Sequence, residues 1–222
     1  MPRSDALTTA RFAGLLYLTI ILLGLTSELV FRGAVRVPGD PEATAAAIAS
    51  QPMQLRLSIL ADMGMALADV GLAVLLLRLL RDLGEGLALA ATAFRLVQAA
   101  VIGASLPLLM AAASLAETDP VGAGEAFARH GFAYDLGLMF FGVNSILTGL
   151  LIVRLGAAGR LLGAGLMVAG LVYMTGTTLR ILSPDLAAAF APAYGLTVLA
   201  EGAITVWLLV GGPWRSTRLA HA

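Results

Sequence analysis

The sequence predicts an all-α integral membrane protein, in which a single transmembrane domain over residues 1–222 forms a bundle of six spanning helices. Two features of the composition predict this class, since 59% of the residues are hydrophobic and 13% are charged. Ordinary soluble domains contain about 25% charged residues, so this chain lacks the side chains that would cover a water-exposed surface. The third observation is that six apolar stretches reach the length of about 20 residues that a spanning helix needs.

These six stretches are the predicted spans, and the connections after the second and the fourth are short enough to form tight hairpins. The spans comprise residues 11–30, 54–80, 87–112, 131–153, 161–181 and 193–210. The first stretch is longer than the apolar region of a signal peptide and no small-x-small cleavage pattern follows it. We therefore expect it to be retained as a helix.

Aspartate followed by proline predicts helix starts between the spans. In the first loop Asp40 precedes Pro41, and an acidic N-cap before proline is typical of the beginning of a helix. A short surface helix is therefore expected from Pro41 to about Ser50. Asp119-Pro120 repeats the pattern in the third loop.

The arginines predict the orientation in the membrane. Eight lie on the side that holds the N-terminus, the second and fourth loops and the C-terminus, namely Arg3, Arg11, Arg78, Arg81, Arg154, Arg160, Arg215 and Arg218. Five lie on the other side, namely Arg32, Arg36, Arg56, Arg129 and Arg180. An excess of basic residues marks the cytoplasmic side, so both termini are expected in the cytoplasm.

Composition excludes several chemistries. All 14 basic residues are arginine, so a lysine Schiff base is excluded. The chain has no cysteine and two histidines, His130 and His221, so thiolate chemistry is excluded and a bis-histidine haem is not expected. The formal net charge is zero, without the basic face that nucleic acid requires. We expect membrane lipids as partners, no nucleic acid and no cofactor.

Several polar side chains fall inside the spans, where each ionisable group costs at least about 2.5–3.5 kcal/mol and needs a partner or a role. The predicted intramembrane cluster consists of Asp62, Asp69, Arg95, Gln98, Asn144, Tyr173 and Glu201. Asp69 and Arg95 lie eleven and eight residues from the inner ends of the second and third spans, and therefore at similar depth. Two interpretations are open: a buried ion pair that fixes helix register, or a polar cavity for a small solute or protons. Glu201 favours the cavity, since its one obvious cationic neighbour is Arg95.

A second group of polar residues lies nearer the predicted outer face. This outer cluster consists of Glu28, Arg56, His130, Asp135 and Arg180, together with Arg32. One interpretation is a metal site formed by His130 and the nearby carboxylates, because imidazole and carboxylate suit several divalent ions. We favour a network of salt bridges and predict no metal, because a single histidine is weak evidence for a metal site.

Two sets of short motifs carry a family resemblance. In the first half they are Val37-Pro38-Gly39-Asp40, Ala43-Thr44, Arg56, Ala61-Asp62, Asp69 and Phe94-Arg95-Leu96-Val97-Gln98-Ala99. In the second half they are Asp135-Leu136-Gly137, Phe140-Phe141-Gly142, Gly149, Arg160-Leu161-Leu162-Gly163 and Gly170-Leu171-Val172-Tyr173. On these motifs the chain, from about Arg11 to Pro184, resembles a bacterial multi-span membrane family, domain-of-unknown-function family 4386.

The resemblance implies a multi-pass protein of the bacterial cytoplasmic membrane with no established activity, and it supplies no catalytic residues. The residues that stand at its marker positions are Asp40, Thr44, Arg56, Asp62, Asp69, Arg95, Gln98 and Asp135. This set adds Asp40 and Thr44 of the first loop to the candidate site. The chain departs from the family at Tyr134 and Asn144, where histidine is frequent. If those histidines bind a metal or relay protons in relatives, this chain lacks that ability.

Three functions remain open. The leading hypothesis is a protein that binds or transports a small solute or protons through a polar cavity between the second, third, fourth and sixth spans. The second is a membrane-embedded enzyme in which His130 and the outer carboxylates act on a lipid-like substrate. The third is a non-catalytic sensor or assembly protein whose first-loop helix docks a partner. The sequence favours a protein that is not an enzyme and does not set the oligomeric state.

Overall fold

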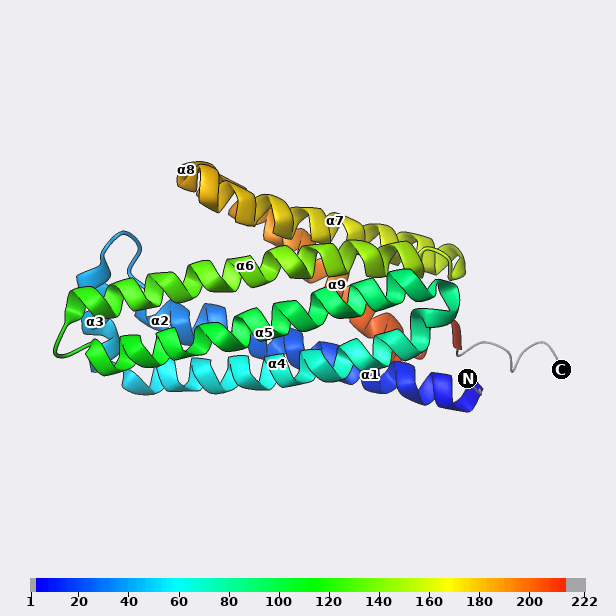
Figure 1. The fold of residues 1–222 in the computed structure, drawn as a ribbon, viewed down its shortest axis with the longest axis horizontal. Coiled ribbons are helices and arrows are strands. Elements are labelled where there is room, and N and C mark those ends of the chain that lie inside the picture. Colours follow the sequence, from blue (N-terminus) through cyan, green and yellow to red (C-terminus); the bar gives the residue numbers. More distant parts are fainter. Residues whose placement is uncertain (1–2, 215–222) are drawn as a thin grey trace.

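The computed structural model describes residues 3–214, which form helices and loops without strands (Figure 1). The long helices are α1 (Arg3–Leu25), α4 (Pro52–Leu80), α5 (Glu85–Leu115), α6 (Pro120–Ile152), α7 (Gly156–Leu182) and α9 (Tyr194–Leu209). The short ones are the π-helix η1 (Thr26–Arg32), α2 (Gly33–Val35), α3 (Pro41–Ser50), η2 (Arg81–Leu83), α8 (Pro184–Phe190), η3 (Ala191–Ala193) and η4 (Gly212–Trp214). Arg215, Arg218 and His221 lie outside the described residues.

The predicted fold class is confirmed. Six helical segments of the described chain are long and apolar enough to cross a membrane: 4–35, 52–83, 85–115, 120–152, 156–182 and 184–214. The expected short helix of the first loop is α3, which begins and ends at the predicted residues. The protein is therefore a multi-pass, all-α membrane protein.

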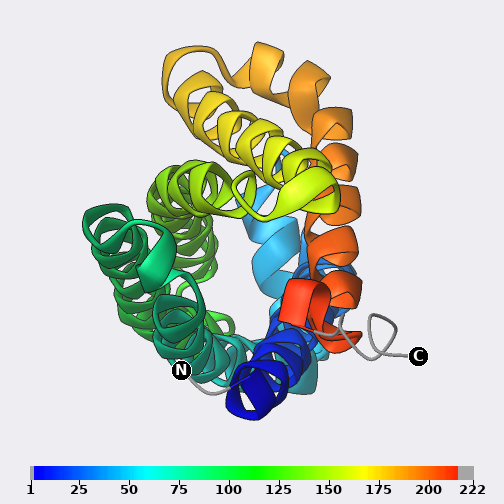
Figure 2. The same ribbon diagram turned by 90° about the vertical axis from the view of Figure 1, so that its right-hand side faces the viewer.

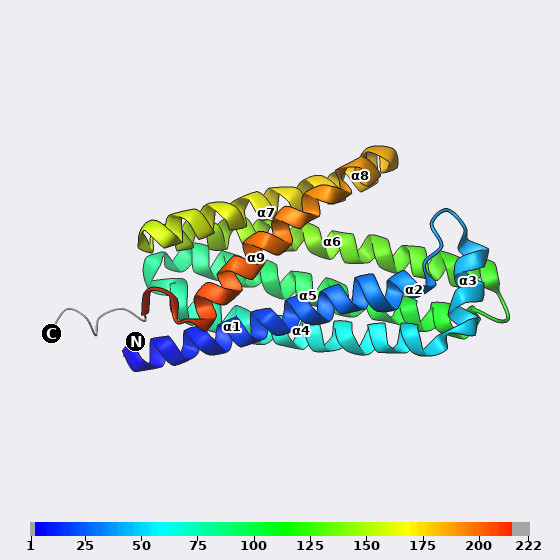
Figure 3. The ribbon, with the colours of Figure 1, turned by 180° about the vertical axis from the view of Figure 1, so that it is seen from behind.

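The six long helices form a closed ring in which each packs against two others. The order around the ring is α1, α4, α5, α6, α7, α9 and back to α1, as seen along the long axis in Figure 2. We call the end of the bundle that carries α3 the α3 end, and the end at which α1 begins the opposite end (Figure 1). Ring closure brings the first and last spans into contact, with α9 crossing α1 obliquely (Figure 3).

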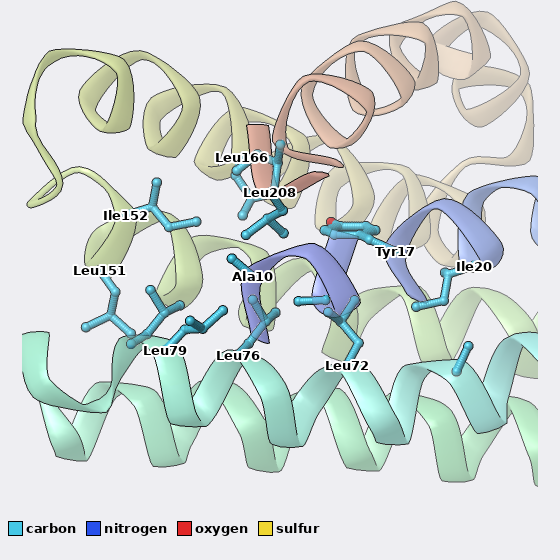
Figure 4. Packing of buried hydrophobic residues seen from close by; sticks show 14 of the residues in the cluster. Ala10, Tyr17, Ile20, Leu72, Leu76, Leu79, Leu151, Ile152, Leu166 and Leu208 are labelled. Carbon is cyan, nitrogen blue, oxygen red and sulfur yellow. The ribbon is translucent and has the colours of Figure 1, made fainter. Parts of the chain in front are cut away.

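At the opposite end, apolar side chains fill the interior of the ring. The cluster includes Ala10, Leu72, Leu76, Leu79, Leu151, Ile152, Leu166 and Leu208, all buried (Figure 4). These residues come from α1, α4, α6, α7 and α9, and Ala88 and Ile102 of α5 belong to the same cluster, which therefore joins all six spans. Burial of side chains of this size stabilises packing by dispersion contacts even where lipid is the solvent. The opposite end is therefore closed by packed aliphatic groups.

At the α3 end, α3 lies across α6 and is held there by capping and by apolar contacts. Asp40 begins the helix, accepting a hydrogen bond from the backbone N–H of Ala43 at 2.8 Å. Ile48 of α3 is buried against Leu55, Leu109 and other apolar residues of the neighbouring helices. The loop before α3 is thereby placed over the interior of the ring.

A proline-marked helix start explains why α6 exceeds its predicted span. Helix α6 begins at Pro120, eleven residues before the predicted span that starts at residue 131. Asp119 caps it, accepting from the backbone N–H of Gly122 at 3.0 Å. The span prediction followed apolarity alone, whereas the cap and the proline set the actual beginning of the helix.

Candidate functional site

A cavity of about 890 Å³ occupies the interior of the ring, between the α3 end and the middle of the bundle. All six spans line it, so it also involves the first and fifth spans, which the sequence-based cavity hypothesis left out. Aliphatic and aromatic side chains form much of the wall, with polar groups at separate points. Volumes of about 300–1,000 Å³ with a few convergent polar groups are typical of small-molecule sites.

One side of the cavity borders the apolar surface of the bundle. Leu25, Leu29 and Val198 line the cavity and are also exposed, Leu29 to 68%. They come from the end of α1, from η1 and from α9. Toward the α3 end α9 lies away from α2, which follows η1 in the chain (Figure 3). The cavity therefore has an apolar border between the first and last spans.

The floor of the cavity rests on an ion pair in the middle of the bundle. Arg95 of α5 and Asp69 of α4 are almost fully buried, and Nη2 of the arginine lies 2.6 Å from Oδ1 of the aspartate. Gln98, one turn after Arg95, donates from Nε2 to Oδ2 of Asp69 at 3.1 Å. Arg95 also donates from Nη1 to Oδ1 of Asn144 at 3.2 Å, and Asn144 donates to the backbone oxygen of Ala91 at 2.8 Å.

Two aromatic rings enclose the charge of Arg95. Its guanidinium carbon lies 5.2 Å from the ring centroids of both Tyr17 on α1 and Phe141 on α6. Such cation–π contacts stabilise a desolvated guanidinium. Asp69 and Gln98 line the cavity, whereas Arg95 and Asn144 lie outside its lining. Tyr17 and Phe141 were not identified from the sequence, because an aromatic residue in an apolar span carries no signal of its orientation.

Glu201 of α9 stands apart from this network. It is 5% exposed and lines the cavity, and its Oε1 accepts a hydrogen bond from the hydroxyl of Tyr173 at 2.5 Å. Within residues 3–214 it takes part in no salt bridge. Tyr173 makes edge contacts with the rings of Phe141 and Tyr194, with centroids 5.2 and 5.7 Å away. A carboxyl group bound to Tyr173, the central ring of three aromatic side chains, thus lines the cavity.

Near the α3 end a second buried arginine organises the polar residues. Arg32, the last residue of the π-helix η1, is 1% exposed and forms an ion pair with Asp62 of α4. Its Nη1 also donates to the hydroxyls of Ser27 and Ser58 at 2.8 Å, and its Nε to Glu28 at 2.8 Å. Single π turns inside helices are frequent at functional sites.

This placement divides the predicted intramembrane cluster. Asp62 belongs with Arg32, about 10 Å along α4 from Asp69, because seven residues separate the two aspartates and each adds about 1.5 Å. Ser27 and Ser58 were missed from the sequence, although Ser58 lies one turn before Asp62 and therefore shares its face. Asp69, Arg95, Gln98 and Asn144 form the network at the floor, and Tyr173 and Glu201 form a separate hydrogen-bonded pair in the wall.

His130 is buried and lines the same cavity. Ser105 uses its one hydroxyl proton to donate to the backbone oxygen of Ile102 at 2.6 Å, so its Oγ must accept from Nδ1 of His130 at 3.0 Å. That hydrogen bond assigns the proton to Nδ1 and leaves Nε2 as an acceptor. Nε2 is buried and has no hydrogen-bond partner among the described residues.

The remaining members of the outer cluster do not converge on His130. Asp135 pairs with Arg180 of α7, and Glu28 pairs with Arg32 and Arg36. Arg56 is exposed and takes no part in these contacts. No group of three or more histidine, aspartate or glutamate side chains suited to a metal ion occurs within residues 3–214. Four members of the predicted outer cluster, Glu28, Arg32, Asp135 and Arg180, form salt bridges, and His130 and Arg56 take no part in them.

The loop motif forms the rim of the cavity at the α3 end. Asp40 caps α3, and the hydroxyl of Thr44 lies 2.9 Å from the backbone oxygen of Asp40 and 3.0 Å from the backbone nitrogen of Val37. Gly39 has φ of 76°, a conformation that favours glycine. These contacts explain the Val-Pro-Gly-Asp and Ala-Thr motifs as a rigid turn over the cavity.

Comparison with known proteins gives a family and no activity. Neither a search of curated proteins nor a search of solved structures finds a match. The model of one family, described as a domain of unknown function (DUF4386), matches residues 12–212, which is 201 of the 222 residues. The chain therefore belongs to the family described as domain of unknown function DUF4386.

Proposed function

We propose that this membrane protein binds a small molecule in the cavity above Asp69, Gln98 and Glu201. The observation that supports it is the convergence of buried polar side chains on an open volume inside the ring. Polar groups within a membrane are costly and mark ligand or ion pathways when they face a cavity. Packed aliphatic residues at the opposite end leave the cavity accessible from the α3 end and from its apolar border.

The proposal extends to the setting of the protein. The excess of arginine at the opposite end favours cytoplasmic termini, so the cavity would face away from the cytoplasm of a bacterial cell. A site at mid-membrane depth between helices also suits a transporter in one of its states. We place binding first, because the apolar cluster at the opposite end contains buried side chains from all six spans and closes a continuous path there.

A cavity-filling variant with a matched control tests the proposal. Leu138 lines the cavity, whereas Leu136 on the same helix is 42% exposed and does not. Leu138→Trp should remove any bound small molecule, and Leu136→Trp should leave it in place. The measurement is native mass spectrometry of protein extracted with its surrounding membrane, with bound non-lipid mass as the readout. The same mass on both variants, or none on the unmodified protein, would contradict the proposal.

A further inference from the structure

Beside the cavity, two buried acceptor atoms and one buried donor atom, Nη2 of Arg32, have no hydrogen-bond partner among the described residues, and the charge of Arg32 is already paired with Glu28 and Asp62. Gln98 uses Nε2 to donate to Asp69, so its Oε1 is left, and that atom is buried without a partner among the described residues. His130 has its proton on Nδ1, which leaves the unpartnered Nε2 as an acceptor. Glu201 contributes carboxylate oxygens, of which one accepts from Tyr173. A ligand that satisfies all three side chains must therefore bring donors.

The charges around the cavity leave one carboxylate over. Apart from Asp40 at the rim, five carboxylates lie in its wall or directly behind it, namely Glu28, Asp62, Asp69, Asp135 and Glu201, and four arginines pair with the first four, namely Arg32, Arg36, Arg95 and Arg180. Asp40 at the rim is occupied as the cap of α3. Glu201 is thus the buried carboxylate without a cation within salt-bridge distance in residues 3–214. A buried ionised carboxylate requires a compensating positive charge.

Aromatic side chains supply the rest of a cation site. Phe141, Tyr173 and Tyr194 line the same cavity as Glu201; Tyr173 donates to Glu201 and contacts the rings of Phe141 and Tyr194 edge to face. Faces of aromatic rings attract organic cations, most strongly where water is excluded. The apolar border formed by Leu25, Leu29 and Val198 offers a surface for the carbon skeleton of the same ligand.

We propose that the ligand is an organic ammonium, a protonated amine on an apolar skeleton, whose N–H groups bind Glu201 among these aromatic rings. The inference rests on the proposed function, because it assigns a chemical class to the occupant of the same cavity. Gln98 and His130 are the further acceptors available to the ammonium and to hydroxyl or amide groups on the ligand. An anionic ligand would meet Glu201 and Asp69 without an unpaired arginine within the described wall.

Three probes with one carbon skeleton separate charge from shape. They are 3,3-dimethylbutylamine, which is protonated at neutral pH, the neutral 3,3-dimethylbutan-1-ol and the anionic 3,3-dimethylbutanoate. Binding is measured on the full chain in detergent by the rise of the thermal unfolding midpoint with probe concentration. We expect the amine to bind at least about tenfold more tightly than the alcohol, with the acid weakest. Equal binding of amine and alcohol, tighter binding of the acid, or no binding of the amine would overturn the ammonium assignment.

Variants connect this selectivity to Glu201. Glu201→Gln keeps the size of the side chain and should reduce the affinity for the amine to that for the alcohol. Glu85→Gln is the matched control, since Glu85 is 66% exposed and lies outside the cavity; it should retain the tenfold preference. Tyr194→Leu, which removes one ring, should weaken the amine and spare the alcohol, and it serves if Glu201→Gln does not fold. Retained preference in both Glu201→Gln and Tyr194→Leu would refute the site.

The failure of this inference can be told apart from failure of the proposed function. If the alcohol or the acid binds wild type at least as tightly as the amine and Leu138→Trp abolishes that binding, the cavity binds small molecules and the ammonium class is wrong. If Leu138→Trp changes neither probe binding nor the native mass, the cavity is not a binding site and both proposals fail.

Discussion

Separating the two charges of the central ion pair should destabilise the fold more than removing both. Asp69→Asn leaves Arg95 charged and buried. Of its two polar partners among the described residues, only Asn144, whose Oδ1 lies 3.2 Å away, is then unchanged. The rings of Tyr17 and Phe141 are present before and after the change, so they do not offset the loss. Breaking a buried pair by removing one partner costs about 3–5 kcal/mol, and we expect this loss of unfolding free energy for Asp69→Asn and for Arg95→Gln.

The double variant tests whether that cost comes from the pair. With both side chains neutral no buried charge is left alone, so the loss should be about 3 kcal/mol smaller than the sum of the two single losses. The assay is reversible unfolding in mixed micelles with increasing dodecyl sulfate, read by circular dichroism. Glu125→Gln is the control, because its partner Arg129 is 70% exposed and such surface pairs contribute about 0–1 kcal/mol. Single losses below about 1 kcal/mol, or a double loss equal to the sum, would refute the reasoning.

Three further predictions follow from other contacts. Arg32→Lys should lower the free energy of unfolding by at least about 2 kcal/mol, because one ammonium group cannot replace the several guanidinium N–H groups that bind four side chains. Arg36→Lys is the control: Arg36 is 41% exposed, and the substitution should change the free energy of unfolding by less than about 0.5 kcal/mol. Gly163→Ala places its Cβ 2.6 Å from a backbone oxygen of α6 and should lower the free energy of unfolding by about 1–3 kcal/mol. Gly103→Ala is the control, because its Cβ meets no atom within 4 Å, and it should be neutral or stabilising by up to about 1 kcal/mol. Equal effects of the two substitutions would contradict the packing argument. Since the chain contains no cysteine, Glu42→Cys should react with a membrane-impermeant maleimide on intact cells, and labelling only after lysis would reverse the proposed orientation.

The sequence by itself determined the spans, the helix starts and one central contact. Length and apolarity were sufficient to predict the six spans, because a helix that crosses the hydrocarbon layer must match its thickness and carry mostly apolar side chains. Asp40 and Asp119 before proline located the beginnings of α3 and α6. The contact between Asp69 and Arg95 followed from depth, since a tight hairpin holds two neighbouring helices in register and the rise per residue is constant.

Only the tertiary structure decided which side chains face the interior. In the helix of a water-soluble protein, the polar face marks the exposed side and the apolar face marks the buried side. Lipid is as apolar as the protein core, so the sequence of a spanning helix says little about which of its faces is buried. The sequence therefore gave no orientation for Tyr17 or Phe141, and no indication that the ring closes through α1 and α9. That closure brings Glu201 of the last span beside Tyr173 and leaves it outside the ion pairs in which arginines neutralise Glu28, Asp62, Asp69 and Asp135. The cavity and its one buried unpaired carboxylate among the described residues follow from how the helices are arranged around the ring. The depth of a residue depends on its position along its own helix, whereas the direction in which its side chain points depends on the neighbouring helices.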